Sequence, residues 1–342
     1  MKNLFLVLTL SVTLVACSDG TNEQMAVTTD ANEQNAVAFG NYNQAETARN
    51  FNNWAQLGAN NQMLHLKELS PIGPGAPTIR MNLDTLYSVG VYDNDGEMLV
   101  TIPESDLYQS IMILDTDGYT PFFLSAPGQY PIKHDSETLF IAVRTGVEDR
   151  HSRESFEKAH AAQKGIEVEG FGPDEYVMPA YDQEQLHALT AEYNQKMLAA
   201  KIPFTYGDGI TPVNEEHRTW SNAAGWGGMV IEVGVSNVYE TSEKLPGDVC
   251  HSVTFPETGN TFFTSFTIYD TDGYLMEGNS HINSYTWDSE EDGYTTIHFN
   301  CEGAVNNITS GGNEFNYIVR NYGASQAVID QEINPIIPTP VQ

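Results

Sequence analysis

Two groups of strand-like runs, with helical segments before and between them, constrain the fold of this chain more than any other feature. The first group lies between residues 78 and 145, and the second lies between residues 248 and 322. In the second group, Phe262, Phe266 and Ile268 alternate with polar residues, which is typical of a sandwich strand with one buried face. We therefore expect an α+β domain followed by an all-β domain.

Helical spacing of apolar residues predicts three helical segments: residues 44–69, 152–164 and 182–200. Asp182 is placed to cap the last of them. The chain has 342 residues, of which 40% are apolar, so it can fill two cores. We place the α+β domain at residues 39–200 and the β-sandwich at residues 201–342.

The N-terminus has the pattern of an export signal in residues 1–16. Lys2 precedes an apolar run that is too short to span a membrane. The run ends in "LVAC", which resembles a bacterial lipobox, and this resemblance implies that Cys17 is acylated. Ser18 follows, which implies the outer membrane, with the protein facing the periplasm. Residues 17–38 are polar and fit a tether. The alternative is an ordinary cleaved signal with a chance cysteine.

The net charge of −31 comes from 46 Asp and Glu against 15 Lys and Arg. This charge repels phosphate polymers, so we expect no nucleic-acid partner. The sequence has no P-loop, dinucleotide fingerprint, G-x-S-x-G elbow or HExxH motif, so we expect neither a cofactor nor a metal. The isolated histidines are expected to be solvated. A Ser-His-Asp triad built from distant segments stays open, because triads are recognised by geometry.

Two cysteines remain after Cys17, and export permits a disulfide between them. Cys301 shares a buried strand face with Phe299 and Ile297, whereas Cys250 falls on the face opposite Val253. This pattern leaves the bond between Cys250 and Cys301 undecided.

A turn motif occurs twice, as "LDTDGYT" from Leu114 and "YDTDGYL" from Tyr269. An EF-hand loop needs Gly at position 6 and an acidic ligand at position 12. Counted from Asp115 and from Asp270, the glycine comes at position 4, and position 12 is Ala126 or His281. We interpret the motif as a tight strand-ending turn, with calcium binding as the alternative.

A family resemblance covers nearly all residues after 40. "NYNQAETARNF", "IRMNLDTLYSVGVYD" and "YQSIMILDTDGYT" resemble the domain-of-unknown-function family 1254. "NAAGWGG", "TSFTIYDTDGYLME", "IHFNCEG" and "EFNYIVRNY" resemble its C-terminal companion, family 1214. The resemblance implies an α+β domain joined to a jelly-roll-like antiparallel β-sandwich, and it implies no established reaction.

The chain departs from the family pattern at four positions. Leu83 stands where an Arg is usual, and Gly118 where a His is common. Thr264 replaces a usual Trp, and Asn307 takes the place of a frequent second Cys. If the missing Arg or His is catalytic in the family, this chain has an altered activity.

The candidate site begins with residues 79–87, which we expect to form a strand. Arg80, Asn82 and Asp84 then share one face, with Tyr87 close by. A guanidinium, an amide and a carboxylate in a row can recognise a carboxylate or sugar hydroxyls. The alternative is a structural ion pair between Arg80 and Asp84.

Two further arginines, Arg144 and Arg320, lie in otherwise apolar strands and need a partner. That partner is Asp84, Asp117 or a ligand anion. Trp226, between glycines, offers a flat face to a ligand or to the other domain.

These residues lead to three functional hypotheses. The first is a lipid-anchored envelope protein whose interdomain cleft binds a small polar or anionic ligand. The residues expected to line this cleft are Arg80, Asn82, Asp84, Tyr87, Asp117, Tyr119, Trp226 and Arg320. The second is a hydrolase or lyase in the same cleft, with Asp84 or Asp117 as general base and Tyr87 as a further catalytic candidate. The third is an envelope assembly protein without a small ligand.

Overall fold

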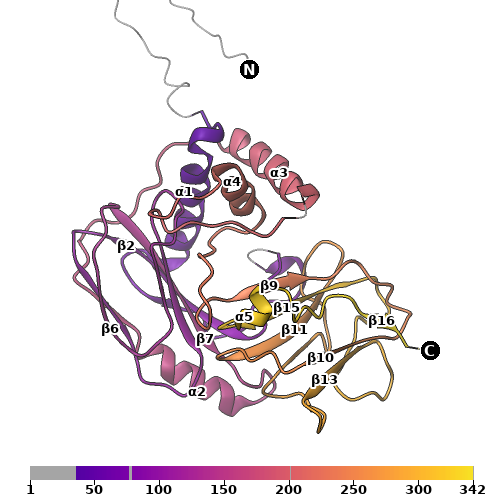
Figure 1. Cartoon of the computed structure of the whole chain (residues 1–342). Helices are drawn as coiled ribbons and strands as arrows, with labels where there is room; N and C mark the ends of the chain where they lie inside the picture. The colour runs from indigo at the N-terminus through magenta and orange to yellow at the C-terminus, as the bar shows by residue number, and fades with distance from the viewer. Residues whose placement is uncertain (1–35, 77–78, 201, 342) are drawn as a thin grey trace, which may run out of the picture. The chain divides into compact units, whose positions relative to one another are not determined.

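The computed structural model describes residues 36–76, 79–200 and 202–341 (Figure 1). The predicted signal peptide, Cys17 and most of the predicted tether lie outside the described residues. Within the described ranges, no helix has the length and apolar character that crossing a membrane requires. Residues Val37–Gln342 form one compact unit.

The first domain is built on a five-stranded antiparallel sheet with the strand order β1-β2-β7-β4-β5. Its strands are β1 (Leu64–His65), β2 (Thr85–Asp93), β4 (Gln109–Leu114), β5 (Phe122–Leu124) and β7 (Thr138–Gly146). A smaller antiparallel sheet has the order β6-β3-β8. Its strands are β6 (Gly128–Ile132), β3 (Met98–Ile102) and β8 (Glu167–Glu169).

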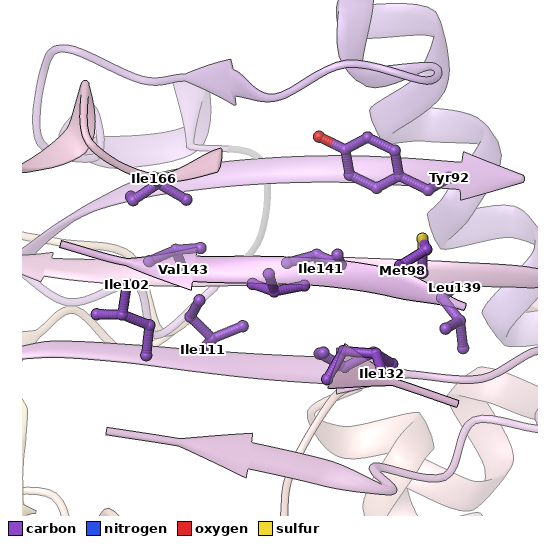
Figure 2. Packing of buried hydrophobic residues seen from close by; sticks show 11 residues of the cluster. Tyr92, Met98, Ile102, Ile111, Ile132, Leu139, Ile141, Val143 and Ile166 are labelled. Atoms are coloured by element: carbon purple, nitrogen blue, oxygen red, sulfur yellow. The ribbon is translucent and has the colours of Figure 1, made fainter. Parts of the chain in front are cut away.

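Both faces of the five-stranded sheet are buried. Side chains such as Ile111 and Ile141 pack against those of the smaller sheet on one face (Figure 2). Their neighbours Met112 and Phe140 point to the other face, where they pack with Phe51 of helix α1 (Tyr42–Trp54). This alternation explains why the strands of the first group consist of nearly continuous apolar runs.

Helix α1 packs with α3 (Gln183–Ala200) and α4 (Glu215–Ala224), and the three lie together in Figure 1. Asp182 caps α3 as predicted, because its Oδ1 accepts the backbone N–H groups of residues 184 and 185. The predicted helix over residues 44–69 is too long. A π-helical turn (Ala55–Ala59) ends it, where Gly58 takes a φ of 104°.

Four further helices lie in the described residues. They are η1 (Phe39–Asn41), η3 (Gly73–Gly75), α2 (Arg153–Gln163) and α5 (Gln326–Ile329). Helix α2 packs on the first domain through Ala159, which contacts Leu86 of β2. The domain boundary expected at residue 200 stays a prediction, although α4 lies beyond it and packs on α3 of the preceding segment.

The second domain is a β-sandwich of two four-stranded sheets, as expected. One sheet consists of β14 (Asn307–Ile308), β13 (Tyr294–Phe299), β10 (His251–Pro256) and β16 (Thr339–Pro340). The other consists of β12 (His281–Asn283), β11 (Phe263–Tyr269), β15 (Asn316–Tyr322) and β9 (Val238–Thr241). Pairing is antiparallel except between β13 and β14. Phe266, Phe299 and Tyr317 form the centre of the core between the sheets.

Strand β11 is buried on both faces, unlike β10 and β13. Phe266 and Ile268 point into the sandwich core. The alternate residues point the other way, where Phe263 packs with Tyr108 and Tyr269 packs with Leu83 of the first domain. The half-buried strand expected from the sequence is therefore fully covered, because its polar face forms the seam between the two domains.

The cysteine pair left undecided by the sequence is joined: Cys250 and Cys301 form a disulfide with an S–S distance of 2.01 Å. Cys250 immediately precedes β10 and Cys301 lies two residues after the end of β13, and these two strands are neighbours. The bond therefore links two neighbouring strands at one end of the sheet with the order β14-β13-β10-β16.

The repeated motif forms the same turn twice. Asp115 Oδ1 accepts hydrogen bonds from the backbone N–H groups of Asp117 and Tyr119. In the second copy, Asp270 Oδ1 accepts hydrogen bonds from the backbone N–H groups of Asp272 and Tyr274. The glycine takes a positive φ in both copies, 76° at Gly118 and 91° at Gly273. The predicted turn is thus confirmed, with its carboxylate engaged by the backbone.

Candidate functional site

The segment before β2 folds as a turn and not as the predicted strand. Arg80 has a φ of 58°, and β2 begins only at Thr85. Asn82 explains this start, because its Oδ1 accepts the N–H groups of Asp84 and Thr85. Its amide also donates to the Tyr87 hydroxyl at 2.8 Å. The expected row of side chains on one strand face is therefore wrong, but the turn directs Asp84 to the seam.

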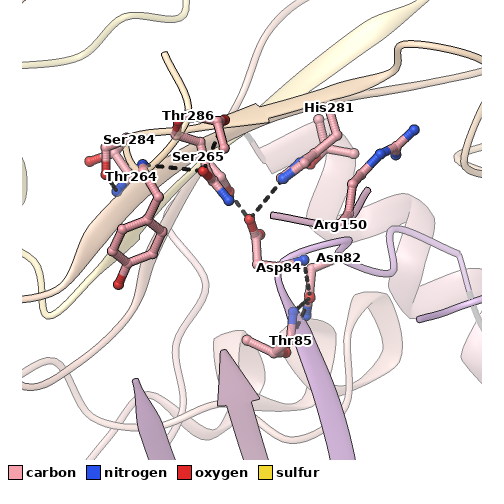
Figure 3. Close-up of polar contacts among 12 residues, drawn as sticks. Asn82, Asp84, Thr85, Arg150, Thr264, Ser265, His281, Ser284 and Thr286 are labelled. Atoms are coloured by element: carbon pink, nitrogen blue, oxygen red, sulfur yellow. Dashed lines mark hydrogen bonds and ion pairs between the residues drawn. The ribbon is translucent and has the colours of Figure 1, made fainter. Parts of the chain in front are cut away.

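Asp84 is fully buried and joins the two domains (Figure 3). Its Oδ2 accepts hydrogen bonds from Ser265 Oγ at 2.8 Å and from the Tyr322 hydroxyl at 2.9 Å. Its Oδ1 lies 3.2 Å from His281 Nε2. His281 Nδ1 in turn lies 3.0 Å from Thr267 Oγ1. Two side chains of the sandwich thus donate hydrogen bonds to this carboxylate of the first domain, and His281 lies beside its other oxygen.

Burial controls the protonation of the groups around Asp84. It lowers the pKa of His281 to about 4, although the neighbouring Asp84 carboxylate acts in the opposite direction. Burial raises the pKa of Tyr322 well above its ordinary value, and Asp84 adds to that increase. At neutral pH the imidazole is therefore uncharged, and the phenol is a hydrogen-bond donor.

Two rows of side chains run across strands on the two sides of the seam. The row in the first domain consists of Tyr87 (β2), Arg144 (β7) and Ser110 (β4). The row in the sandwich consists of Ser265 (β11), Arg320 (β15) and Tyr239 (β9). Residues paired directly across strands project to the same side of a sheet, so each row presents an arginine flanked by hydroxyl groups.

Tyr239 lies near both arginines. The Arg320 guanidinium carbon is 5.4 Å from the centre of the Tyr239 ring, and Tyr239 interacts electrostatically with both Arg320 and Arg144. Tyr239 keeps 42% of its surface exposed, whereas Arg320 keeps only 3%. Tyr239 is thus the one of these three residues with a large exposed surface.

These arginines retain unused donors. Arg320 Nη2 donates to the carbonyl oxygen of Arg80 at 2.7 Å. Arg320 Nη1, and Nε and Nη1 of Arg144, are buried without a hydrogen-bond partner among the described residues. We name Arg80, Asp84, Arg144, Tyr239 and Arg320 the seam site.

No ion pair within 4.0 Å joins any arginine of the seam site to a carboxylate among the described residues. The alternative of an ion pair between Arg80 and Asp84 is therefore not realised. By contrast, the arginines on helices are paired within their own helices: Arg49, Arg153 and Arg218. In the described residues, the guanidinium groups without such an ion pair belong to the seam site and to Arg150, which lies in the loop before α2 and donates to the carbonyl oxygen of Gly278.

Three expected site residues lie elsewhere, against the helices. Arg218 of α4 stacks over the Tyr119 ring at 3.8 Å and donates to the carbonyl oxygen of Asp117. Trp226 packs in the first domain's core and donates from Nε1 to Thr47 of α1. No described contact links Asp117, Tyr119 or Trp226 to Asp84. The expected eight-residue cleft is thus wrong, because the turn at Asp117 and the Trp226 loop pack on the helical block.

Several residues of the site were not expected from the sequence. The prediction that isolated histidines are solvated is wrong for His281, which is 6% exposed. Tyr239, Ser265 and Tyr322 carry no local signal, because only the pairing of distant strands brings them to Asp84.

Metal or cofactor ligands are not assembled in the described part of the chain. No group of three or more His, Cys, Asp or Glu side chains in residues 36–76, 79–200 and 202–341 is placed to hold a metal ion. The donors at the seam are guanidinium and hydroxyl groups, which suit an anion and not a cation.

Comparison with known proteins gives the fold. No family model matches the chain, and no curated protein matches it significantly. The crystal structure of the VPA0106 protein from Vibrio parahaemolyticus has a TM-score of 0.64 and 17% identity, covering 89% of this chain and 98% of that one. A putative uncharacterized protein from Burkholderia cenocepacia has a TM-score of 0.49 and 13% identity, covering 88% and 87%. The Vibrio structure supports the fold alone, and neither description names a ligand.

Proposed function

We propose that this chain is a lipid-anchored envelope protein, of the kind formed by families 1254 and 1214, whose seam site binds a small anion such as a carboxylate. The observation that carries the ligand proposal is the pair of arginines with buried, unpaired guanidinium nitrogens, Arg144 and Arg320. An unpaired donor that is buried lowers stability by about 1–3 kcal/mol, and more when it is charged. A carboxylate from solution would satisfy these donors with charge-assisted hydrogen bonds.

Binding is favoured over catalysis by the position of Asp84. Its carboxylate is fully buried, and its Oδ2 is occupied by Ser265 and Tyr322. It therefore holds the sandwich row in place and is not open to a substrate, as a general base must be. Tyr87, the other catalytic candidate nearby, accepts a hydrogen bond from Asn82 on its hydroxyl. The geometry thus favours binding over acid–base chemistry at these two residues.

The test is a thermal-shift series on the purified full-length chain at pH 7.5 with acetate, lactate and succinate. A ligand that binds the folded state raises the melting temperature by an amount set by its concentration relative to Kd. We expect at least one carboxylate to do so, and we expect Arg144→Gln to weaken the response. Arg153→Gln is the matched control, because Arg153 is exposed on α2 and pairs with Glu157.

Two outcomes would contradict the proposal. In the first, no carboxylate in the series raises the melting temperature. In the second, Arg144→Gln responds like the unmodified protein, which would place the binding site elsewhere. Equal loss of response in Arg144→Gln and Arg153→Gln would show a general effect of net charge, and it would also count against the seam site.

A further inference from the structure

The seam site holds more positive charge than its own carboxylate can neutralise. Arg80, Arg144 and Arg320 contribute three positive charges, and Asp84 is the carboxylate that acts on Arg320. Two positive charges are left over. This local excess is notable in a chain whose net charge is −31.

Arg80 belongs to this group through its side chain as well as its backbone. Its carbonyl oxygen accepts the Arg320 hydrogen bond at 2.7 Å. Burial lowers the pKa of Arg80, and the nearby positive charge of Arg320 lowers it further. The two guanidinium groups are therefore close enough to repel each other, and the protein supplies no ion-pair partner within 4.0 Å for either one in the described residues.

We infer that the ligand of the seam site is a small dianion, a dicarboxylate or a phosphate monoester, and this inference rests on the proposed function. A dianion would neutralise both uncompensated charges, whereas a monoanion would leave one guanidinium buried and unpaired. The unpaired donors come from both domains, Nε and Nη1 from Arg144 and Nη1 from Arg320. The ligand's charged oxygens would therefore contact both rows of the seam at once.

In this proposal Tyr239 lies where a ligand enters the seam site, and its hydroxyl is an uncharged hydrogen-bond donor. Burial raises the pKa of its phenol despite the lowering effect of Arg144, so the hydroxyl stays protonated at neutral pH. It is also the exposed member of the seam site, at 42% of its surface. A ligand passing Tyr239 would meet the Arg144 and Arg320 guanidinium groups next.

The experiment compares two ligands of nearly equal shape on the unmodified full-length protein. Succinate carries two carboxylates, and succinamate replaces one of them with a neutral amide. Calorimetric titration at pH 8 gives Kd for each, and inorganic phosphate, which is doubly charged at that pH, forms a third arm. We expect a dianion to bind at least tenfold more tightly than succinamate. A lower Kd for succinate than for phosphate would identify the ligand as a dicarboxylate. A lower Kd for phosphate would identify it as a phosphate monoester.

Two variants then test whether Arg144 supplies one of the positive charges that bind the dianion. Arg144→Gln removes one of the two uncompensated charges, so the preference for the dianion should fall to less than threefold, while Arg153→Gln should keep it. Succinate and succinamate binding with equal Kd to the unmodified protein would overturn the dianion inference and leave the carboxylate site standing. If neither carboxylate nor phosphate binds, the proposed function and this inference fail together.

Discussion

Replacing His281 with glutamine tests the electrostatics at the centre of the seam. In the folded protein burial lowers the pKa of His281 from 6.5 to about 4, and its side chain lies 3.2 Å from the Asp84 carboxylate. The unfolded chain therefore binds a proton more readily than the folded protein between these two values. Stability from the neutral imidazole is present above about pH 6.5 and is lost as the pH falls towards about 4. At about 1.4 kcal/mol for each pH unit, the loss is about 3 kcal/mol.

The assay is urea unfolding of the unmodified protein and of His281→Gln, at constant ionic strength and in steps from pH 7.5 to pH 4. Carboxylates also titrate in this range, so the informative quantity is the difference between the two curves. We expect the unmodified protein to lose about 3 kcal/mol more than His281→Gln over this interval. His187→Gln is the matched control, because His187 is exposed on α3. A difference curve that stays flat from pH 7 to pH 4 would refute the account.

Two further predictions concern export. Cys250→Ser with Cys301→Ser should lower the free energy of unfolding by about 4 kcal/mol, because the disulfide closes a separation of 51 residues; an unchanged urea midpoint would show that the bond contributes nothing. The proposed lipid anchor should give a mature protein that begins at Cys17 and carries acyl chains in intact-mass spectra, and Cys17→Ser should remove them. A mature chain that begins elsewhere without acyl mass would identify an ordinary cleaved signal.

Local patterns predicted the parts of the fold that depend on local interactions. The turn at Asp115 was predicted because an Asp side chain and a glycine with positive φ act within five residues. The cap at Asp182 was predicted for the same reason. The strand expected over residues 79–87 begins only at Thr85, because the Asn82 side chain competes for the backbone N–H groups that a strand would pair.

The site was predicted only in part because its members meet through tertiary pairing. Asp84 and Arg320 were expected from their chemistry, and the structure brings both to the seam. Ser265 and Tyr322 reach Asp84 across more than 180 residues of sequence. Asp117 was grouped with them on chemistry alone, but its backbone turn packs under Arg218 on the helical side. Residue type thus identified candidate groups, and strand register decided which of them meet.

The two domains do not need the charged part of the seam to stay together. Apolar contacts already join them: Tyr108 packs with Phe263 and Tyr322, and Leu83 packs with Tyr269. Burying a guanidinium without a partner opposes folding, and well-packed apolar residues would fill the same volume at lower free energy. If the seam served only to attach the two domains, apolar side chains in place of these arginines would make the folded protein more stable. Under the proposed function, an anion from solution would pair with Arg144 and Arg320 and so account for these two residues between such contacts.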